Sequence, residues 1–382
     1  MSNLPNHEQY LKTRFFGSLD GLRCFSIVWV IGFHCQLDNT RLFHAGAWGV
    51  ELFFIISGFL ITTILLREVS ARGAVSLKNF YARRALRIFP LYYATLLLYI
   101  ALVAALEYGS VREAFFSHLP AYVTYTSNWF VDRNGAQRVI FAFSWSLATE
   151  EQFYLLWPSV LRFAGKGRAP VLILLITLVG AISAQALSFL ALLPFGQPGN
   201  RIVASVEPTI LLGCLLAYAF NDVRWFNRLR SWLGARWSAP LAACFTALTY
   251  FGLLHAPAEP VFKCVLNSTF VFSLLLVVAT CCIREDHGLA PALRNSTVRY
   301  IGAISYGLYL LHMLAMNFTK KVSTSHDWQF FGMTLLLAIG LASASYWLFE
   351  RPLLKLKSRF SAGLESEPSR SSDHARANTS VA

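Results

Sequence analysis

The chain has 382 residues, of which 55% are hydrophobic and 14% are charged, and its formal net charge is +13. A water-soluble domain needs more polar surface than this, so the composition excludes an ordinary soluble protein. The basic residues lie in short stretches between long apolar runs, and no glycine-rich phosphate-binding motif is present, which argues against nucleic-acid binding and nucleotide hydrolysis.

Ten apolar segments approach the length of about 20 residues that a helix needs to cross a bilayer. We expect them at residues 19–37, 47–66, 88–107, 139–160, 169–190, 203–220, 238–255, 264–283, 300–319 and 329–349. With the N-terminus inside, the cytoplasmic segments hold 25 of the 33 Lys and Arg residues, as the positive-inside rule favours. The sequence therefore predicts an all-α integral membrane protein with about ten transmembrane helices and both termini cytoplasmic.

One membrane domain accounts for most of the chain. We expect a cytoplasmic segment at residues 1–16, a transmembrane domain at 17–353 and a disordered cytoplasmic tail at 354–382, where Ser, Arg, Glu and Ala dominate. The first apolar run contains Asp20 and Arg23 and has no obvious cleavage site, so we expect its helix to be retained. The 7 cysteines lack metal-ligand spacing, and we predict no metal site.

Ionisable side chains inside the first predicted span are costly and are therefore functional candidates. Asp20 and Arg23 are three residues apart, which favours an ion pair at the cytoplasmic interface. His34 lies on the same helix face, about 16 Å farther along the axis. Because an imidazole suits a general base near neutral pH, we predict a catalytic role for His34, with a structural hydrogen bond as the alternative. Asp38 is a rival partner for this imidazole.

Arginines follow the second predicted span. Arg84 and Arg87 share one helix face and are suited to grip the phosphates of a polyanionic cofactor, although a positive-inside signal with lipid headgroup contacts is the alternative. Segment 109–138, on the predicted outer side, is long and contains Tyr122 and Tyr125. It is either a cap over a cavity or part of an interfacial aromatic belt.

The fourth predicted span carries Ser146, Glu150 and Tyr154 at intervals of four residues, so the three side chains share a helix face. The depth of Glu150 in the membrane can match that of His34 if the helices tilt. A carboxylate that accepts the imidazole N–H would fix its tautomer and stabilise the imidazolium. The alternative is that Glu150 only ties two helices together.

Three further polar residues occur in or beside predicted spans. Glu51 lies near the start of the second span, His312 lies in the ninth, and Glu350 follows the tenth. Each either lines the same cavity or makes a contact between helices, because polar residues also hold membrane helices together.

Together these segments resemble the acyltransferase family 3 of membrane proteins, over residues 17 to 353. The motifs that carry the resemblance are Leu-Asp-Gly-Leu-Arg at 19–23 followed by His34, Gly-Val-Glu-Leu-Phe-Phe-Ile-Ile-Ser-Gly-Phe-Leu at 49–60, Phe-Tyr-Ala-Arg-Arg-Ala-Leu-Arg-Ile-Phe-Pro at 80–90, Trp-Ser-Leu-Ala-Thr-Glu-Glu-Gln-Phe-Tyr at 145–154, Ser-Tyr-Gly-Leu-Tyr-Leu-Leu-His at 305–312 and Phe-Glu-Arg-Pro at 349–352. Their order and spacing are specific. Some family members carry an extra C-terminal extracytoplasmic domain, which we do not expect here.

The resemblance implies an O-acyltransferase that moves an acyl group, expected to be acetyl, from cytoplasmic acyl-CoA to a carbohydrate-type hydroxyl. It implies donor binding by Arg23, Arg84 and Arg87, and we assign catalysis to His34 and Glu150. The supporting cavity candidates are Asp20, Glu51, Ser146, Tyr154 and His312. Ser146 and Tyr154 are also candidate donors to the oxyanion of the tetrahedral intermediate.

The expected acceptor is a surface polysaccharide, lipopolysaccharide, oligosaccharide or glycolipid, and the expected location is the bacterial inner membrane. Membrane lipids, glycan-assembly proteins and a second copy of the chain are the other expected partners. A secondary transporter or flippase for a glycan or lipid-linked sugar is the alternative function, since charges within ten spans also suit transport. The sequence shows no repeat between its halves and no pair of Gly- or Pro-broken spans, which argues against transport.

Overall fold

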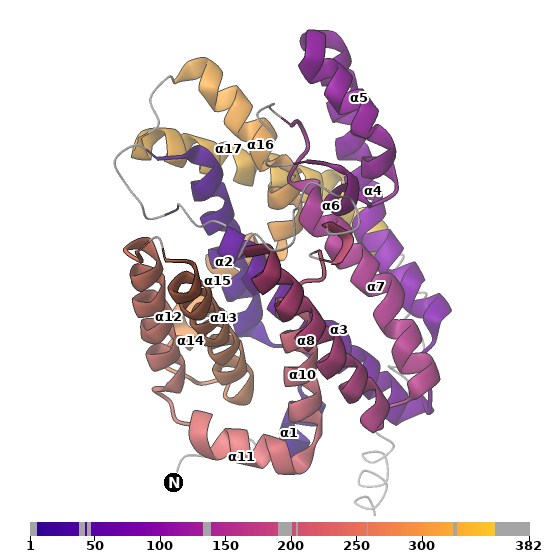
Figure 1. Cartoon of the computed structure of the whole chain (residues 1–382), viewed down its shortest axis with the longest axis vertical. Helices are drawn as coiled ribbons and strands as arrows, with labels where there is room; N and C mark the ends of the chain where they lie inside the picture. Colours follow the sequence, from indigo (N-terminus) through magenta and orange to yellow (C-terminus); the bar gives the residue numbers. More distant parts are fainter. Residues whose placement is uncertain are drawn as a thin grey trace, which may run out of the picture.

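The computed structural model describes residues 6–37, 43, 47–132, 139–189, 201–203, 205–257, 259–323 and 327–355, and every regular element in them is a helix (Figure 1). The helices are α1 (His7–Lys12), α2 (Gly17–Cys35), α3 (Ala47–Arg72), α4 (Leu77–Leu106), α5 (Gly109–Val123), α6 (Ser127–Phe130), α7 (Ser144–Ala164), α8 (Arg168–Phe189), α10 (Pro208–Asn221), α11 (Val223–Leu233), α12 (Ser238–Leu254), α13 (Pro260–Ile283), α14 (Ala290–Leu293), α15 (Ser296–Ala303), α16 (Ser305–Val322), α17 (Trp328–Ser345), the π-helix η1 (Tyr346–Glu350) and α18 (Arg351–Lys355).

Each predicted span overlaps a helix, and the all-α membrane class is supported. By length and composition, six helical stretches in the described part can cross a membrane: α3, α4, α8, α13, Arg201–Asn221 with α10, and Trp328–Lys355 with α17. Counting the bent pairs α11 with α12 (77°) and α15 with α16 (75°) as one span each gives up to eight. α2 and α7 fall outside this group, and they are the helices that carry His34 and Glu150. Ten spans and cytoplasmic termini stay predictions.

Glycines let the central helices approach closely. A Cβ on Gly58 of α3 would lie 2.0 Å from the Ile210 carbonyl oxygen, so α3 and α10 meet backbone to backbone. A Cβ on Gly302 of α15 would lie 1.8 Å from the backbone oxygen of Asp20 in α2. Small residues at such crossings are typical of helix packing in membranes. The packing therefore fixes the start of α2, where Asp20 and Arg23 lie.

Segment 109–138, predicted to lie on the outer side, contributes to the core rather than only to an aromatic belt. Tyr122 of α5 is fully buried, and its hydroxyl donates to the Ile140 carbonyl at 2.9 Å. The ring of Tyr125 stacks on that of Tyr92 in α4, with centroids 4.2 Å apart. Residues 133–138 of this segment lie outside the described residues, as do Asp38 and the predicted tail beyond residue 355.

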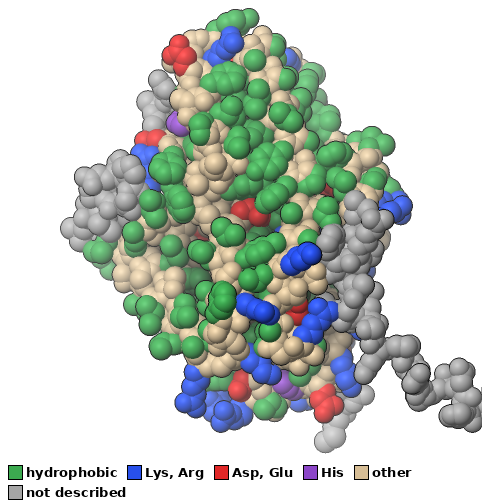
Figure 2. Space-filling model, turned by 90° about the vertical axis from the view of Figure 1, so that its right-hand side faces the viewer, with side chains coloured by type: hydrophobic (Ala, Val, Ile, Leu, Met, Phe, Trp, Pro, Cys, Tyr) green, Lys and Arg blue, Asp and Glu red, His purple; other side chains and the backbone are tan. Residues whose placement is uncertain are grey.

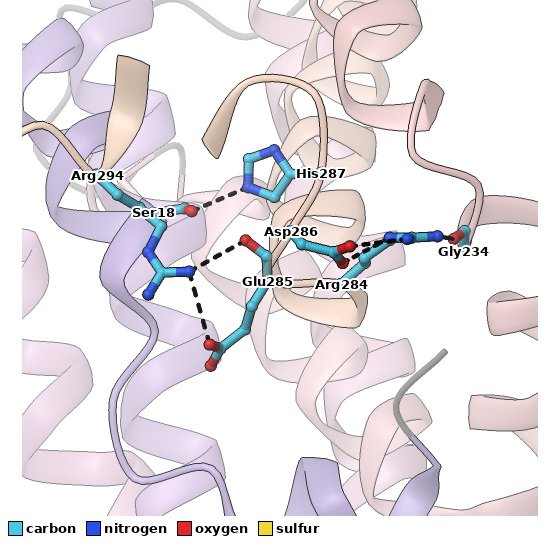
Figure 3. Close-up of polar contacts among 7 residues, drawn as sticks. All are labelled: Ser18, Gly234, Arg284, Glu285, Asp286, His287 and Arg294. Carbon is cyan, nitrogen blue, oxygen red and sulfur yellow. Dashed lines mark hydrogen bonds and ion pairs between the residues drawn. The ribbon is translucent and has the colours of Figure 1, made fainter. Parts of the chain in front are cut away.

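Residues 284–289, between α13 and α14, form a strap that joins two parts of the molecule (Figure 3). Its His287 makes a 2.9 Å hydrogen bond with Ser18 in the first turn of α2. Its Arg284 donates to the Gly234 carbonyl at the end of α11 (3.1 Å) and forms a bidentate ion pair with Asp286 (2.7 and 2.9 Å). The strap thus ties the start of α2 to the junction between α11 and α12.

We expect the folded protein to lose stability in mild acid, because the strap contains the buried His287. Burial, followed by the nearby Arg294 charge, lowers the pKa of His287 from its ordinary 6.5 to about 4. Between those values the unfolded chain binds a proton that the folded chain does not, so stability falls as the pH drops from about 6.5 towards 4. We expect the melting temperature in detergent to fall more between pH 7 and pH 5 for the wild type than for His287→Gln. An equal fall in both proteins would contradict this expectation.

Candidate active site

A cavity with a volume of about 90 Å³ opens among α2, α3, α4, α7 and α16. Three arginines and two glutamates line it, namely Arg23, Arg84, Arg87, Glu150 and Glu151. The polar residues of the lining are Ser57, Ser146, Tyr154, Ser305, Tyr306 and Tyr309. The structure therefore brings six predicted site residues to one place, which are Arg23, Arg84, Arg87, Ser146, Glu150 and Tyr154.

Two of the arginines at the cavity, Arg23 and Arg84, are held in place by neighbouring side chains. Arg23 pairs with Asp20 at 3.2 Å, as the spacing of three residues predicts. The guanidinium of Arg84 lies over the ring of Tyr154, 5.1 Å from its centroid. The adjacent Arg83 instead faces the fully buried Glu68 at 3.7 Å, outside the cavity. Of the three arginines near the start of α4, Arg84 and Arg87 therefore line the cavity, whereas Arg83 has a structural role.

Glu150 is held by two hydroxyl groups. Ser57 of α3 donates a short hydrogen bond to its Oε1, and the Tyr154 hydroxyl donates to the same oxygen at 2.8 Å. Among the described residues, Glu150 makes no hydrogen bond to His34, so the predicted contact between carboxylate and imidazole is absent from this conformation. The rotation of α7 about its axis turns Glu150 towards the arginine-lined cavity instead.

His34 packs against a second imidazole. The rings of His34 and His312 are stacked, with centroids 4.9 Å apart and planes inclined by 21°. His312 is buried, and its Nδ1 lies 2.6 Å from the Tyr309 carbonyl oxygen. Because a carbonyl only accepts, Nδ1 carries the proton and Nε2 carries the lone pair. This buried Nε2 has no hydrogen-bond partner among the described residues.

Phe143, Ser146 and Tyr309 form a layer beside the cavity, and the ring of Tyr309, which lines the cavity, packs against that of His312 with centroids 5.6 Å apart. The Tyr309 hydroxyl donates to the Phe143 carbonyl at 2.9 Å and shares a 2.6 Å hydrogen bond with the Ser146 hydroxyl. The Phe143 ring also packs against that of His312, with centroids 5.5 Å apart. In this conformation the hydroxyls of Ser146 and Tyr154 are therefore engaged by Tyr309 and Glu150, rather than free for an oxyanion.

The other predicted residues lie around this arrangement. Asp20 contributes through its pair with Arg23. Glu51 does not line the cavity, and its buried Oε2 has no hydrogen-bond partner among the described residues. Glu350 accepts a hydrogen bond from Ser345 at 3.3 Å.

Sequence reasoning missed Ser57, Glu151, Tyr306 and Tyr309 as cavity residues. Ser57 was not singled out because it lies within an apolar run of the sequence. It nevertheless falls on the face of α3 that also presents Val50 to the cavity. Tyr309 stands three residues before His312 in a motif that the sequence did single out. The helical period was the available signal for both residues.

Known proteins match this chain over nearly the same residues as the resemblance noted in the sequence. A family model described as an acyltransferase domain matches residues 16–349. The peptidoglycan O-acetyltransferase OatA of Listeria monocytogenes is 29% identical over 328 residues, which cover 81% of this chain and 50% of that protein. The putative peptidoglycan O-acetyltransferase YrhL of Bacillus subtilis is 30% identical over 363 residues, covering 89% and 55%.

A putative O-acetyltransferase of Staphylococcus aureus (strain COL) is 26% identical over 381 residues, which cover 93% of this chain and 60% of that protein. The chain thus spans only about half the length of the first two relatives. No solved structure matches the chain.

Proposed function

The chain belongs to this acyltransferase family, and from that premise we propose that it is a membrane-bound O-acyltransferase. Its donor is acyl-CoA, with acetyl as the expected group, and its acceptor is a hydroxyl of a carbohydrate-type molecule such as a surface polysaccharide or glycolipid. The observation that carries the proposal is a cavity lined by three arginines and by Tyr309, whose ring packs against His312, which in turn stacks on His34.

The arginine-lined cavity is the donor site of the proposal. Guanidinium groups bind phosphates through paired, charge-assisted hydrogen bonds, and CoA carries several phosphates. Arg84 and Arg87 lie near the predicted cytoplasmic end of α4, where cytoplasmic acyl-CoA would enter. Glu150 balances their charge and, through Tyr154, holds the ring over which Arg84 lies.

His34 is the general base of the proposal. The acceptor oxygen attacks the thioester carbonyl as its proton passes to the His34 imidazole. The carbon–sulfur bond then breaks, and the proton goes to the CoA thiolate, which leaves an ester and free CoA. His34 is only partly buried, so an acceptor can reach it, whereas the buried His312 supports its ring.

The layer of Phe143, Ser146 and Tyr309 limits the size of the transferred group, since an acyl group that moves from the cavity to His34 must pass it. We expect Tyr309→Leu to raise the rate with butyryl-CoA relative to acetyl-CoA by about tenfold, the discrimination that one or two methylenes provide in a tight pocket. Transfer rates with both donors measure this ratio. Tyr92→Leu, which also removes a buried tyrosine hydroxyl bonded to a carbonyl, should leave it unchanged. An unchanged ratio in Tyr309→Leu would argue against the layer as a size limit.

Radiolabelled acetyl-CoA tests the proposed function. Membranes from bacterial cells with and without the protein would be incubated with it, and the glycans and glycolipids would then be separated. Label that appears in one glycan fraction only with the protein supports the proposal and identifies the acceptor. Movement of an unmodified glycan across the membrane without any dependence on acyl-CoA would instead favour a transporter.

A further inference from the structure

Helix α11 lies across one end of the bundle, whereas most of the longer helices run along its length (Figure 1). It bends by 77° into α12. Asp222 caps its start by accepting hydrogen bonds from the backbone N–H groups of Arg224 and Trp225, at 2.9 and 3.1 Å. A helix in this orientation can lie in the plane of a membrane interface.

One side of α11 is anchored to the rest of the protein. Phe226 is fully buried and meets the rings of Tyr10 and Phe220 at 5.2 and 5.8 Å. The strap holds the other end, because Arg284 donates to the Gly234 carbonyl (3.1 Å; Figure 3) and the Gly288 N–H donates to the Arg236 carbonyl (2.8 Å). These contacts fix which side of α11 faces outward.

The outward side combines positive charge with large aromatic rings. Trp225 and Trp232 are 53% and 79% exposed, and Trp237 just beyond the helix is 69% exposed. The guanidinium of Arg228 lies 5.1 Å from the centroid of the Trp225 ring. Arg224 is almost fully exposed, and its 4.0 Å approach to Asp222 is too weak to neutralise it.

The charge around α11 is strongly one-sided. Residues 222–237 contain four arginines and one acidic residue, and Lys and Arg side chains gather at this end of the molecule (Figure 2). Indole rings prefer the membrane–water interface, and basic side chains there attract anionic lipids. A soluble protein partner would not need exposed tryptophans next to the predicted hydrocarbon boundary.

We propose that the outward face of α11, formed by Arg224, Trp225, Arg228 and Trp232, is a docking surface for the headgroups of anionic phospholipids. The tryptophans insert at the level of the glycerol backbone, and the arginines bind the lipid phosphates. This surface is separate from the arginine-lined cavity, and the inference does not depend on the proposed function.

Spin-labelled lipids test the surface in the full-length protein reconstituted into phosphatidylcholine vesicles. We expect spin-labelled phosphatidylglycerol to be immobilised in preference to spin-labelled phosphatidylcholine, and Arg224→Gln with Arg228→Gln to reduce this preference about tenfold. Both side chains are exposed, so folding should be retained. Raising the salt concentration to about 1 M should weaken the wild-type preference, because it screens the charges.

The matched control is Lys166→Gln with Arg168→Gln, which removes the same charge from exposed side chains in the connection after α7 and at the start of α8. It should keep most of the wild-type preference. The proposal is wrong if the α11 double variant prefers phosphatidylglycerol as strongly as the wild type does, or if both double variants lose the preference equally.

Discussion

His34→Ala is expected to lower the rate of acyl transfer by about 10³-fold, within the range that general acid–base catalysis contributes. The alanine cannot accept the acceptor proton, and the remaining imidazole of His312 is buried, at 1% exposure. The measurement is the initial rate of transfer from radiolabelled acetyl-CoA in proteoliposomes, normalised to the amount of protein.

His255→Ala is the matched control for this variant. His255 is exposed at the end of α12 and bonds the Phe251 carbonyl at 2.9 Å, far in the chain from any cavity residue. We expect its rate to equal that of the wild type. If His34→Ala retained more than about a tenth of the wild-type rate, His34 would not be the general base.

Arg84→Ala with Arg87→Ala is expected to raise the KM for acyl-CoA by at least about 10²-fold, with a smaller effect on kcat. Hydrogen bonds to charged groups contribute about 1.5–3 kcal/mol each, and two guanidiniums are removed. Steady-state rates at varied donor concentration separate the two constants.

Arg84→Lys distinguishes a specific phosphate contact from simple charge. Lysine keeps the charge but loses the paired donors and the flat contact with the Tyr154 ring, so we expect an intermediate KM. Arg168→Ala, on an exposed arginine at the start of α8, should leave the KM unchanged. If the double variant had the wild-type KM, the cavity would not be the donor site.

Helical periodicity predicted six of the residues that line the cavity. Ser146, Glu150 and Tyr154 were expected on one face of a helix, and all three line the cavity together with Arg84 and Arg87. Membrane helices are long and regular, so spacing along the sequence reliably predicts which side chains share a helix face.

Contacts between distant helices could not be predicted in the same way. The predicted pair of Glu150 and His34 was argued from depth alone, and depth does not specify how two helices are rotated towards each other. Ser57 and Tyr309 owe their places to partners 93 and 163 residues away in the sequence. The sequence also gave no sign that His312 would stack on His34.

The predicted spans also differ from the observed helices in the places where the helix axis breaks. Residues 300–319 were expected as one span, but the chain bends by 75° between α15 and α16. Residues between 221 and 237 were expected to be a connection, and they form α11 instead. Apolar content identifies a span but does not report where its axis turns, which depends on close packing such as that of Gly302 against Asp20.

Transfer from one side of a sealed membrane tests the central claim most directly, since we propose that the acyl group passes from the arginine-lined cavity to His34 across the layer of Phe143, Ser146 and Tyr309. The protein would be reconstituted in vesicles of known orientation, with radiolabelled acetyl-CoA supplied only inside or only outside, and with the acceptor on the opposite side. We expect label on the acceptor only when the donor faces the Arg84 and Arg87 end, and none with His34→Ala. Equal labelling from both sides, or labelling that survives His34→Ala, would contradict the proposed path from cavity to imidazole.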